Sequence, residues 1–180
     1  VVSQLMPRKA KACYVNDVKK PMALFIGSLP TVIFLPQDLE LFTGSPARRR
    51  QFLDTLLCQV SPEYTQLLSR YGKILRQRNS LLRKIAEGSA RPQDLSVWDE
   101  NVADTGSTIT LKRLELLETL QCTLPEELST LTEEFSSVRL RYKRKGEARG
   151  QQEACAELLS LLRHYRERDI LIHSTTVGPH

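Results

Sequence analysis

The sequence lacks any apolar run long enough to cross a membrane. Its longest such run, Met22 to Ile26, is far shorter than the roughly 18 residues that a membrane-spanning helix needs. Cysteine is scarce, and the four cysteines stand tens of residues apart, at positions 13, 58, 122 and 155. This spacing argues against a CxxC metal knuckle and against a compact disulfide framework. We therefore expect no membrane association and a reduced, cytoplasmic setting.

Motifs of the common enzyme classes are missing as well. The three histidines, His164, His173 and His180, stand near the end of the chain, and none belongs to a nucleophile-activating motif. Neither GxGxxG nor GxxxxGK followed by Ser or Thr occurs, so this stretch has no loop whose backbone amides would hold a nucleotide. We identify no catalytic and no metal-ligating residue, and we expect the chain alone to be inactive as an enzyme.

What the sequence does contain is enough apolar material for a folded core. It has 180 residues, of which 41% are hydrophobic, and this suits one or two domains rather than a disordered chain. It begins with Val instead of Met, has no signal-peptide pattern at its start, and ends on TTVGPH. We therefore expect an internal fragment of a longer protein.

Charge is distributed in blocks along the chain. Residues 48 to 84 contain nine Lys and Arg against two carboxylates, residues 92 to 135 contain two against ten, and residues 139 to 149 contain six against one. The chain therefore runs from basic to acidic and back to basic.

The first 35 residues read as pieces of a sheet. Residues 11 to 18 alternate and contain Asn16-Asp17, which predicts a strand that runs into a tight turn. Residues 21 to 29 predict one or two helical turns. The run TVIFL, residues 31 to 35, is β-branched and aromatic and lies between two prolines. It predicts a short buried strand covered on both faces.

Two helix starts follow the same pattern. Gly44 ends a short turn, Ser45 can cap the next helix, and Pro46 suits its first position because the missing N–H is not needed there. Ser61-Pro62 repeats this arrangement. From residue 64 to 85 the apolar positions follow a seven-residue repeat that is broken only by Arg78, which predicts a long amphipathic helix.

A second long helix is predicted after the turn at residues 87 to 92, with Asp94 as a cap. Its apolar pattern runs from about residue 95 to 131, although Gly106 weakens it and Pro125 should kink or restart it. Two long helices joined by a short turn must run antiparallel, so we expect a helical hairpin.

The period changes from 3.6 to 2 after this hairpin. Val138, Leu140 and Tyr142 alternate with Arg139, Arg141 and Lys143, which predicts a strand with one basic, solvated face. A final helix is expected over residues 151 to 168. The fold class predicted is thus α+β and mainly helical.

Basic residues are the remaining candidates for a binding site. Arg70, Lys73 and Arg76 recur near helical spacing and could neutralise nucleic-acid phosphates, with Arg83 and Lys84 further along. The alternative is a solvated face that pairs with the neighbouring acidic helix. The strand face formed by Arg139, Arg141 and Lys143 is a second candidate, and it has no acidic neighbour in sequence.

Four stretches, in this order, resemble motifs of the RecF family. They are PQDLELFTGSPARRRQFLD at residues 36 to 54, YGKILRQRNSLL at 71 to 82, WDENVADTGSTITLKRLELL at 98 to 117, and RERDILIHSTTVGPH at 166 to 180. RecF proteins are bacterial DNA replication and repair proteins with an ABC/SMC-type ATPase head and an inserted helical arm. The resemblance implies that residues 1–44 belong to the head, 45–135 to the antiparallel arm, and 136–180 to the return into the head.

The resemblance also implies ligands and partners. A RecF-type parent would bind ATP and Mg²⁺ as a weak DNA-dependent ATPase through motifs outside this stretch, and this chain alone would bind neither. The RecF-type parent would bind single-stranded, gapped or linear double-stranded DNA and form an ATP-dependent homodimer. With RecO and RecR as partners, it would load RecA indirectly and so support recombinational repair and the SOS response. Gln37 stands where the family usually has Glu. Related ATPases place a glutamine near this strand end to bind magnesium, so Gln37 is a candidate cofactor-binding residue.

The competing hypothesis is a free-standing helical-hairpin adaptor that binds protein and neither nucleotide nor DNA. The cluster Arg48, Arg49 and Arg50 bears on both hypotheses, because cations are unfavourable near a helix N-terminus and need an anion nearby. An internal partner is available in Asp54 or in the acidic turn just upstream. We expect Arg50 to form a structural clamp, and Arg48 and Arg49 to face solvent and contact DNA.

Overall fold

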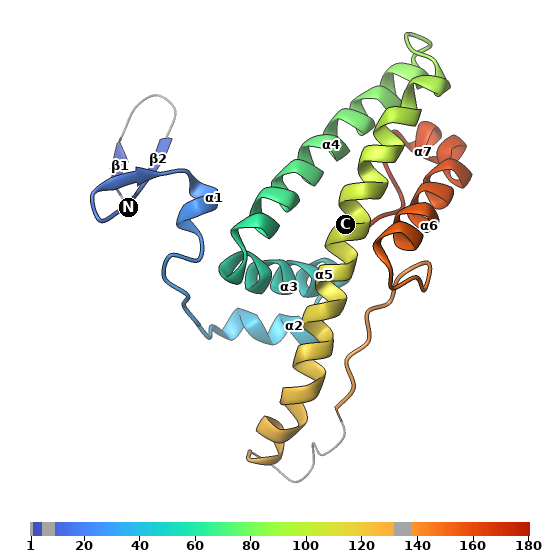
Figure 1. Cartoon of the computed structure of the whole chain (residues 1–180). Helices are drawn as coiled ribbons and strands as arrows, with labels where there is room; N and C mark the ends of the chain where they lie inside the picture. Colours follow the sequence, from blue (N-terminus) through green and yellow to red (C-terminus); the bar gives the residue numbers. More distant parts are fainter. Residues whose placement is uncertain (1, 5–9, 132–137) are drawn as a thin grey trace. The chain divides into compact units, whose positions relative to one another are not determined.

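The computed structural model describes residues 2–4, 10–131 and 138–180 (Figure 1). The chain divides into two compact units, Val1–Leu67 and Leu68–His180.

The first unit begins with a small antiparallel sheet. Its strands β1 (Val2–Gln4), β2 (Ala10–Val15) and β3 (Val18–Lys20) lie in the order β1-β2-β3. The turn between β2 and β3 contains Asn16 at φ 49° and Asp17 at φ 62°. Two positive φ angles are what a two-residue hairpin turn requires, and Asn and Asp tolerate them better than other side chains. The predicted strand and tight turn are therefore confirmed.

The segment TVIFL is not the buried strand that its composition predicts. After the short helix α1 (Met22–Phe25), residues 31–35 form no strand, and the side chains of Val32, Ile33 and Phe34 are 98%, 72% and 78% exposed. A strand needs a neighbour for its backbone groups and a layer over each buried face. The described part of the first unit supplies neither, because its sheet is formed by β1, β2 and β3 alone.

The helix starts predicted at the two Ser-Pro pairs are confirmed. A 3-10 turn η1 (Pro36–Leu39) leads into α2 (Glu40–Thr43), which ends at Gly44. Helix α3 (Pro46–Val60) begins at the first proline and buries Leu53 and Leu57, although Ser45 makes no capping hydrogen bond through its side chain. At the second pair, Ser61 Oγ accepts a hydrogen bond from the Tyr64 N–H at 3.1 Å, and α4 (Pro62–Ala86) follows.

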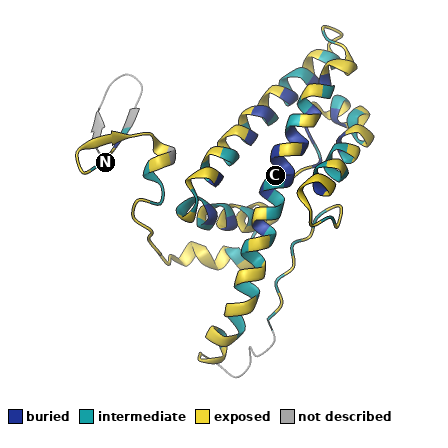
Figure 2. Cartoon of the chain, viewed as in Figure 1, coloured by how far each residue is buried: buried dark blue, intermediate teal, exposed yellow. Residues whose placement is uncertain are grey.

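The second unit is dominated by an antiparallel helical hairpin (Figure 1). Its first helix is the remainder of α4, and its second is α5 (Ser96–Ser129), reached through a turn with Gly88 at φ 73° and the 3-10 turn η2 (Pro92–Leu95). Buried positions of both helices (Figure 2) form the core, among them Ile74, Leu82, Val102 and Ile109, together with Leu95 of η2. Helix α5 continues without interruption through Pro125, where the sequence predicts a kink or a restart.

Gly106 does not end α5 either, and its role is one of packing. A Cβ atom at this position would lie 2.9 Å from Leu158 Cδ2, 3.2 Å from Pro179 Cδ and 3.3 Å from Tyr71 Cε2. Glycine thus lets three other parts of the unit approach the helix closely.

The predicted strand at residues 138–143 is extended but forms no ladder. Its side chains alternate as expected, half-buried at 138, 140 and 142 and exposed at 139, 141 and 143. Its neighbour is helix α5 (Figure 1), to which Gln121 connects it, and a helix has no free backbone edge to pair with. The alternation therefore predicted the burial correctly and the strand pairing wrongly.

The final helix is divided in two. Helix α6 (Gln151–His164) ends at Tyr165, whose backbone at φ −91° and ψ 8° is not helical, and α7 (Arg166–Ile172) follows. His173 then adopts a left-handed conformation at φ 57° and ends α7. Residues 174–180 run on without regular structure.

Candidate functional site

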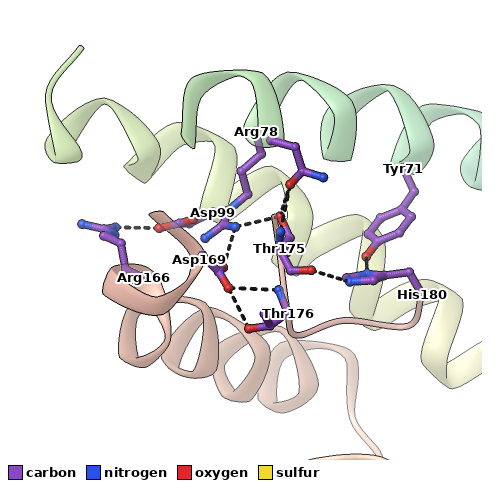
Figure 3. A network of polar contacts seen from close by, with 9 residues as sticks. Tyr71, Arg78, Asp99, Arg166, Asp169, Thr175, Thr176 and His180 are labelled. Atoms are coloured by element: carbon purple, nitrogen blue, oxygen red, sulfur yellow. Dashed lines mark hydrogen bonds and ion pairs between the residues drawn. The ribbon is translucent and has the colours of Figure 1, made fainter. Parts of the chain in front are cut away.

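Arg78 lies at the centre of the second unit. Its side chain is fully buried, at the one position where a charged residue interrupts the apolar repeat of α4. The guanidinium Nε donates to Asp99 Oδ1 at 2.8 Å, and Nη1 donates to Asp169 Oδ2 at 2.7 Å and to Thr175 Oγ1 at 2.7 Å (Figure 3). One side chain of α4 therefore connects α5, α7 and the last segment of the chain.

The charges of this network cancel. Asp99 also accepts a hydrogen bond from Arg166 Nη2 through its second oxygen, at 2.6 Å, so two arginines face two aspartates. Burying charges costs several kcal/mol per ion unless each is paired and hydrogen-bonded. Pairing is nearly complete here, although Arg78 Nη2 and Arg166 Nε have no hydrogen-bond partner among the described residues. The network has no surplus charge that would call for a bound ion.

Two threonines of the last segment are fastened to this network. Thr175 donates to Asn79 Oδ1 through its N–H at 3.0 Å and through its hydroxyl at 2.6 Å. Thr176 does the same to Asp169 Oδ1, at 3.0 and 2.7 Å. Each threonine thus satisfies both its backbone N–H and its hydroxyl on a single side chain.

His180 is held by two hydrogen bonds. Its Nε2 lies 3.0 Å from the Thr175 carbonyl oxygen, which can only accept, so Nε2 carries the proton. Its Nδ1 lies 2.7 Å from the Tyr71 hydroxyl. Burial raises the pKa of Tyr71 well above its ordinary value, although the charges of Arg113 and Arg78 oppose this. Tyr71 therefore keeps its proton, and with a neutral His180 its hydroxyl donates a hydrogen bond to Nδ1, so the ring is held from both of its nitrogens.

Glycine at position 178 is required by this arrangement. Gly178 has φ 142°, and a Cβ atom there would lie 2.6 Å from the Tyr71 hydroxyl oxygen and 2.8 Å from His180 Nδ1. The following Pro179 carbonyl accepts a hydrogen bond from Arg113 Nη1 of α5. The T-x-x-G-P-H pattern is therefore a segment folded against α4 and α5.

In the sequence, Arg78 stands out only as a break in the apolar repeat, and its hydrogen-bond partners could not be predicted. That break was the available signal, because a charged residue at a core position needs a buried partner. Asp99, Asp169 and Thr175 all lie in stretches that resemble the RecF family, but nothing in their local sequence says that they meet. The network is accordingly a structural site whose residues lie within these motifs, although the motifs do not show that the residues contact one another.

The arginines at the start of α3 have internal partners. Arg48 pairs with Glu40 at 2.7 Å, and Arg49 Nη1 donates to the carbonyl oxygens of Leu41 and Gly44 at 3.2 and 3.0 Å. The acidic turn upstream therefore supplies one of the anions that the cluster needs, and carbonyls at the end of α2 supply acceptors. These contacts go to Arg48 and Arg49, whereas the sequence predicts the clamp at Arg50, which is half-buried.

The cations of α4 other than Arg78 are exposed. Arg70, Lys73 and Arg76 make no ion pair with any residue that the structure describes, and the pair that joins α4 to α5 is the buried one between Arg78 and Asp99. The described residues thus give no support to the alternative that exposed pairs cancel the charge of this helix. On the extended segment, Arg139, Arg141 and Lys143 are exposed and equally without an ion pair in the described ranges.

Within the described ranges, the candidate cofactor-binding residue stands apart from any metal-ligating group. Gln37 lies exposed in the turn η1, and no hydrogen bond of its side chain is seen within the described ranges. Those ranges also contain no group of three or more His, Cys, Asp or Glu that could hold a metal ion, and no helix long and apolar enough to span a bilayer. The four cysteines are free.

Comparisons with known proteins converge on one family. No family model matches the chain. The chain is 36% identical over 178 residues to the DNA replication and repair protein RecF of Herpetosiphon aurantiacus, covering 98% of the chain and 45% of that protein. It is 35% identical over 154 residues to RecF of Heliobacterium modesticaldum, covering 85% and 41%. It is 32% identical over 176 residues to RecF of Streptococcus thermophilus, covering 97% and 48%.

Solved structures agree with this result. Two structures of the recombination mediator protein RecF in the RecFOR pathway, RecF-ATPrS and RecF-ATP, superpose with a TM-score of 0.86 at 30% identity, over 96% of the chain and 47% of theirs. The chain thus spans about half the length of the relatives it matches. The predicted fold class, α+β and mainly helical with an antiparallel helical hairpin, is confirmed by the agreement with these RecF structures. The chain belongs to the RecF family of DNA replication and repair proteins.

Proposed function

We propose that this chain is the arm-containing central segment of a RecF-type protein that binds single-stranded and gapped DNA. With RecO and RecR, such a protein supports the loading of RecA, recombinational repair and the SOS response. The observation that carries the proposal is the agreement in fold and sequence with RecF over 96% of the chain. A free-standing adaptor would not be expected to share both.

The domain assignment is part of this proposal. Residues 1–44 would belong to the head, 45–135 to the helical arm, and 136–180 to the return into the head. The hairpin of α4 and α5 supports the assignment of the arm. Most of the polar network lies between this hairpin and residues 166–180, so it would fasten the arm to the returning segment.

ATP and Mg²⁺ would belong to the whole protein. Phosphoryl transfer needs backbone amides, a lysine and magnesium ligands arranged around the phosphates. The residues described here do not fit such a site by themselves, because Gln37 is the one candidate and stands exposed without a partner group in the described ranges. We therefore expect no ATP hydrolysis by the chain alone, and any ATP-dependent homodimer would need the remainder of the parent. Purified chain that releases phosphate steadily, in proportion to its concentration, would contradict this.

DNA binding by the chain is the direct test. We expect weak, sequence-independent binding, because exposed arginines and lysines contact phosphates and release counterions. Fluorescence anisotropy with labelled single-stranded, gapped and duplex DNA should show affinity that falls steeply between roughly 50 and 200 mM salt. The contrary result would be no binding to any of the three DNAs at the lowest salt. Co-purification of the full-length protein with RecO and RecR tests the assignment of partners.

A further inference from the structure

We propose that residues 138–143 form a preorganised rail that holds the phosphate backbone of a nucleic-acid strand through Arg139, Arg141 and Lys143. We call these residues the basic rail. The inference rests on the proposed function and deepens it, because it names one surface of the chain through which DNA would be held.

The three cations stand on one side of an extended segment. Side chains at 139, 141 and 143 are exposed, whereas those at 138, 140, 142 and 144 are half-buried. In extended backbone, residues two apart point to the same side at a spacing of roughly 6.5 to 7 Å. The segment therefore presents positive charges at a regular interval along a line. Such an arrangement suits a nucleic-acid strand, whose phosphates are also spaced regularly.

The inner side of the rail is fastened by a single side-chain amide. Gln121 Nε2 donates to the Val138 carbonyl at 2.8 Å, and the Leu140 N–H donates to Gln121 Oε1 at 2.6 Å. The amide thus satisfies one backbone acceptor and one backbone donor, as a neighbouring strand would. Further along, Arg113 Nη1 donates to the Tyr142 hydroxyl at 2.8 Å. Helix α5 provides both contacts, so a rigid element sets the line of the rail.

The far end is held by α6. Arg144, which points inward, pairs with Glu157 at 3.9 Å and donates to the Ala148 carbonyl at 2.5 Å. The Glu157 carboxylate also accepts the N–H groups of Glu147 and Ala148 at 3.2 to 3.3 Å. The inner cation, Arg144, is therefore paired within the chain, and the three outer cations of the basic rail remain available to contact a ligand.

Nucleic acid fits this surface better than an acidic protein does. The outer face presents three exposed cations, and the apolar residues between them in sequence, Leu140 and Tyr142, are half-buried, whereas a protein interface needs an apolar centre. Arginine suits phosphate because its planar guanidinium can donate two parallel hydrogen bonds. Contacts of this kind go to the backbone and carry no base readout, so binding should be independent of sequence.

The test compares two variants of equal charge in the 180-residue chain. The rail variant is Arg139→Ala/Arg141→Ala/Lys143→Ala. The control variant, Arg91→Ala/Lys112→Ala/Arg149→Ala, removes three exposed cations that pair with Asp94, Glu115 and Glu118. We expect the rail variant to bind labelled oligothymidine about tenfold or more weakly at low salt, and to lower the salt slope of the affinity by about two to three units. The control should keep the slope within about one unit of the parent chain.

The variant Gln121→Leu tests whether DNA binding depends on how the basic rail is positioned as well as on its charge. It keeps all three cations and removes the fastening, so affinity should fall severalfold while the salt slope stays within about one unit of that of the parent chain. Far-ultraviolet circular dichroism checks that each variant still folds. A duplex of the same length, measured in parallel, shows which form of DNA supplies the phosphates.

The outcomes separate this inference from the proposed function. If the rail variant binds oligothymidine as the parent chain does, the rail is wrong and DNA binding by another surface stands. If the parent chain binds no DNA, the proposed function fails as well. Polyglutamate that competes as strongly as oligothymidine would overturn the assignment to nucleic acid, because the surface would then bind polyanions in general.

Discussion

Val32 in the first unit and Arg78 in the second reverse the usual places of apolar and charged side chains. Val32 is 98% exposed, and the neighbouring Ile33 and Phe34 are also mostly in solvent, whereas Arg78 is 0% exposed. Their difference lies in what surrounds each of them. Arg78 meets two carboxylates and a hydroxyl within its own unit, and Val32 meets no covering layer among the described residues of the first unit. Whether a side chain of this chain is buried thus depends on the groups that surround it as much as on its own polarity.

Removing the buried charge should have the largest effect. Arg78→Ala leaves two buried aspartates without their shared partner, and breaking a buried pair in this way costs about 3–5 kcal/mol of unfolding free energy. Urea denaturation measures it. Arg76→Ala, an exposed position two residues earlier on the same helix, is the control and should change stability by no more than about 0.5 kcal/mol. A cost below about 1 kcal/mol at Arg78 would mean that the network admits water.

Two glycines of the second unit should respond with opposite signs. Gly106→Ala places a methyl group 2.9 Å from Leu158 Cδ2, so overpacking should destabilise the chain by about 1–3 kcal/mol, less what the helix gains. At Gly72 the same methyl group would meet only Arg76 Nη1, at 3.7 Å. Gly72→Ala should therefore stabilise α4 by up to about 1 kcal/mol. Thermal denaturation of both variants decides the matter, and equal shifts of the same sign would contradict the close packing at Gly106.

Tyr71 should make stability fall in alkaline solution. An unfolded tyrosine ionises near pH 10, whereas burial raises the pKa of Tyr71 in the folded chain well above that value. Above about pH 10 the unfolded chain releases a proton that the folded chain retains, so this contribution decreases by at most about 1.4 kcal/mol per pH unit. In Tyr71→Phe this part of the decrease should vanish. Denaturation curves of the two proteins from about pH 8 to about pH 11 test it, and parallel pH dependences would refute it.

Polar substitution in the exposed apolar run should have the smallest effect. Val32→Ser and Ile33→Ser change side chains that are 98% and 72% exposed, so stability should stay within about 0.5 kcal/mol of the parent chain. Leu82→Ala, at a residue with no exposed surface, is the contrast and should cost about 2–5 kcal/mol. A loss of more than about 1 kcal/mol at Val32 would show that the run is covered in solution.

Much of the helical framework could be predicted because its signals are local. Pro46 and Pro62 stand at the first position of α3 and α4, and the apolar repeat predicted nearly the whole of α4. The hairpin followed from two long helices and a short turn. Prediction failed at Tyr165, where a single expected helix divides, because a non-helical backbone conformation at one residue leaves no trace in a pattern averaged over several turns.

Alternation was a weaker guide than the helical repeat. In residues 138–143 it correctly predicted which side chains point inward, since that follows from extended backbone alone. It could not predict that a glutamine 17 and 19 residues upstream of Val138 and Leu140 would take the place of a neighbouring strand. In TVIFL the composition predicted a buried strand, but burial requires neighbours that composition does not supply.

The sequence by itself determined the elements whose hydrogen bonds close within a few residues, namely the helices, their proline starts and the Asn16-Asp17 turn. Tertiary structure alone decided the candidate site. Arg78 meets Asp99, Asp169 and Thr175 across separations of 21, 91 and 97 residues, and Tyr71 meets His180 across 109. The physical reason is that a buried charge is stabilised by whichever groups the fold brings within hydrogen-bonding distance. A local pattern can show that Arg78 needs such partners, and only the packed chain shows which residues they are.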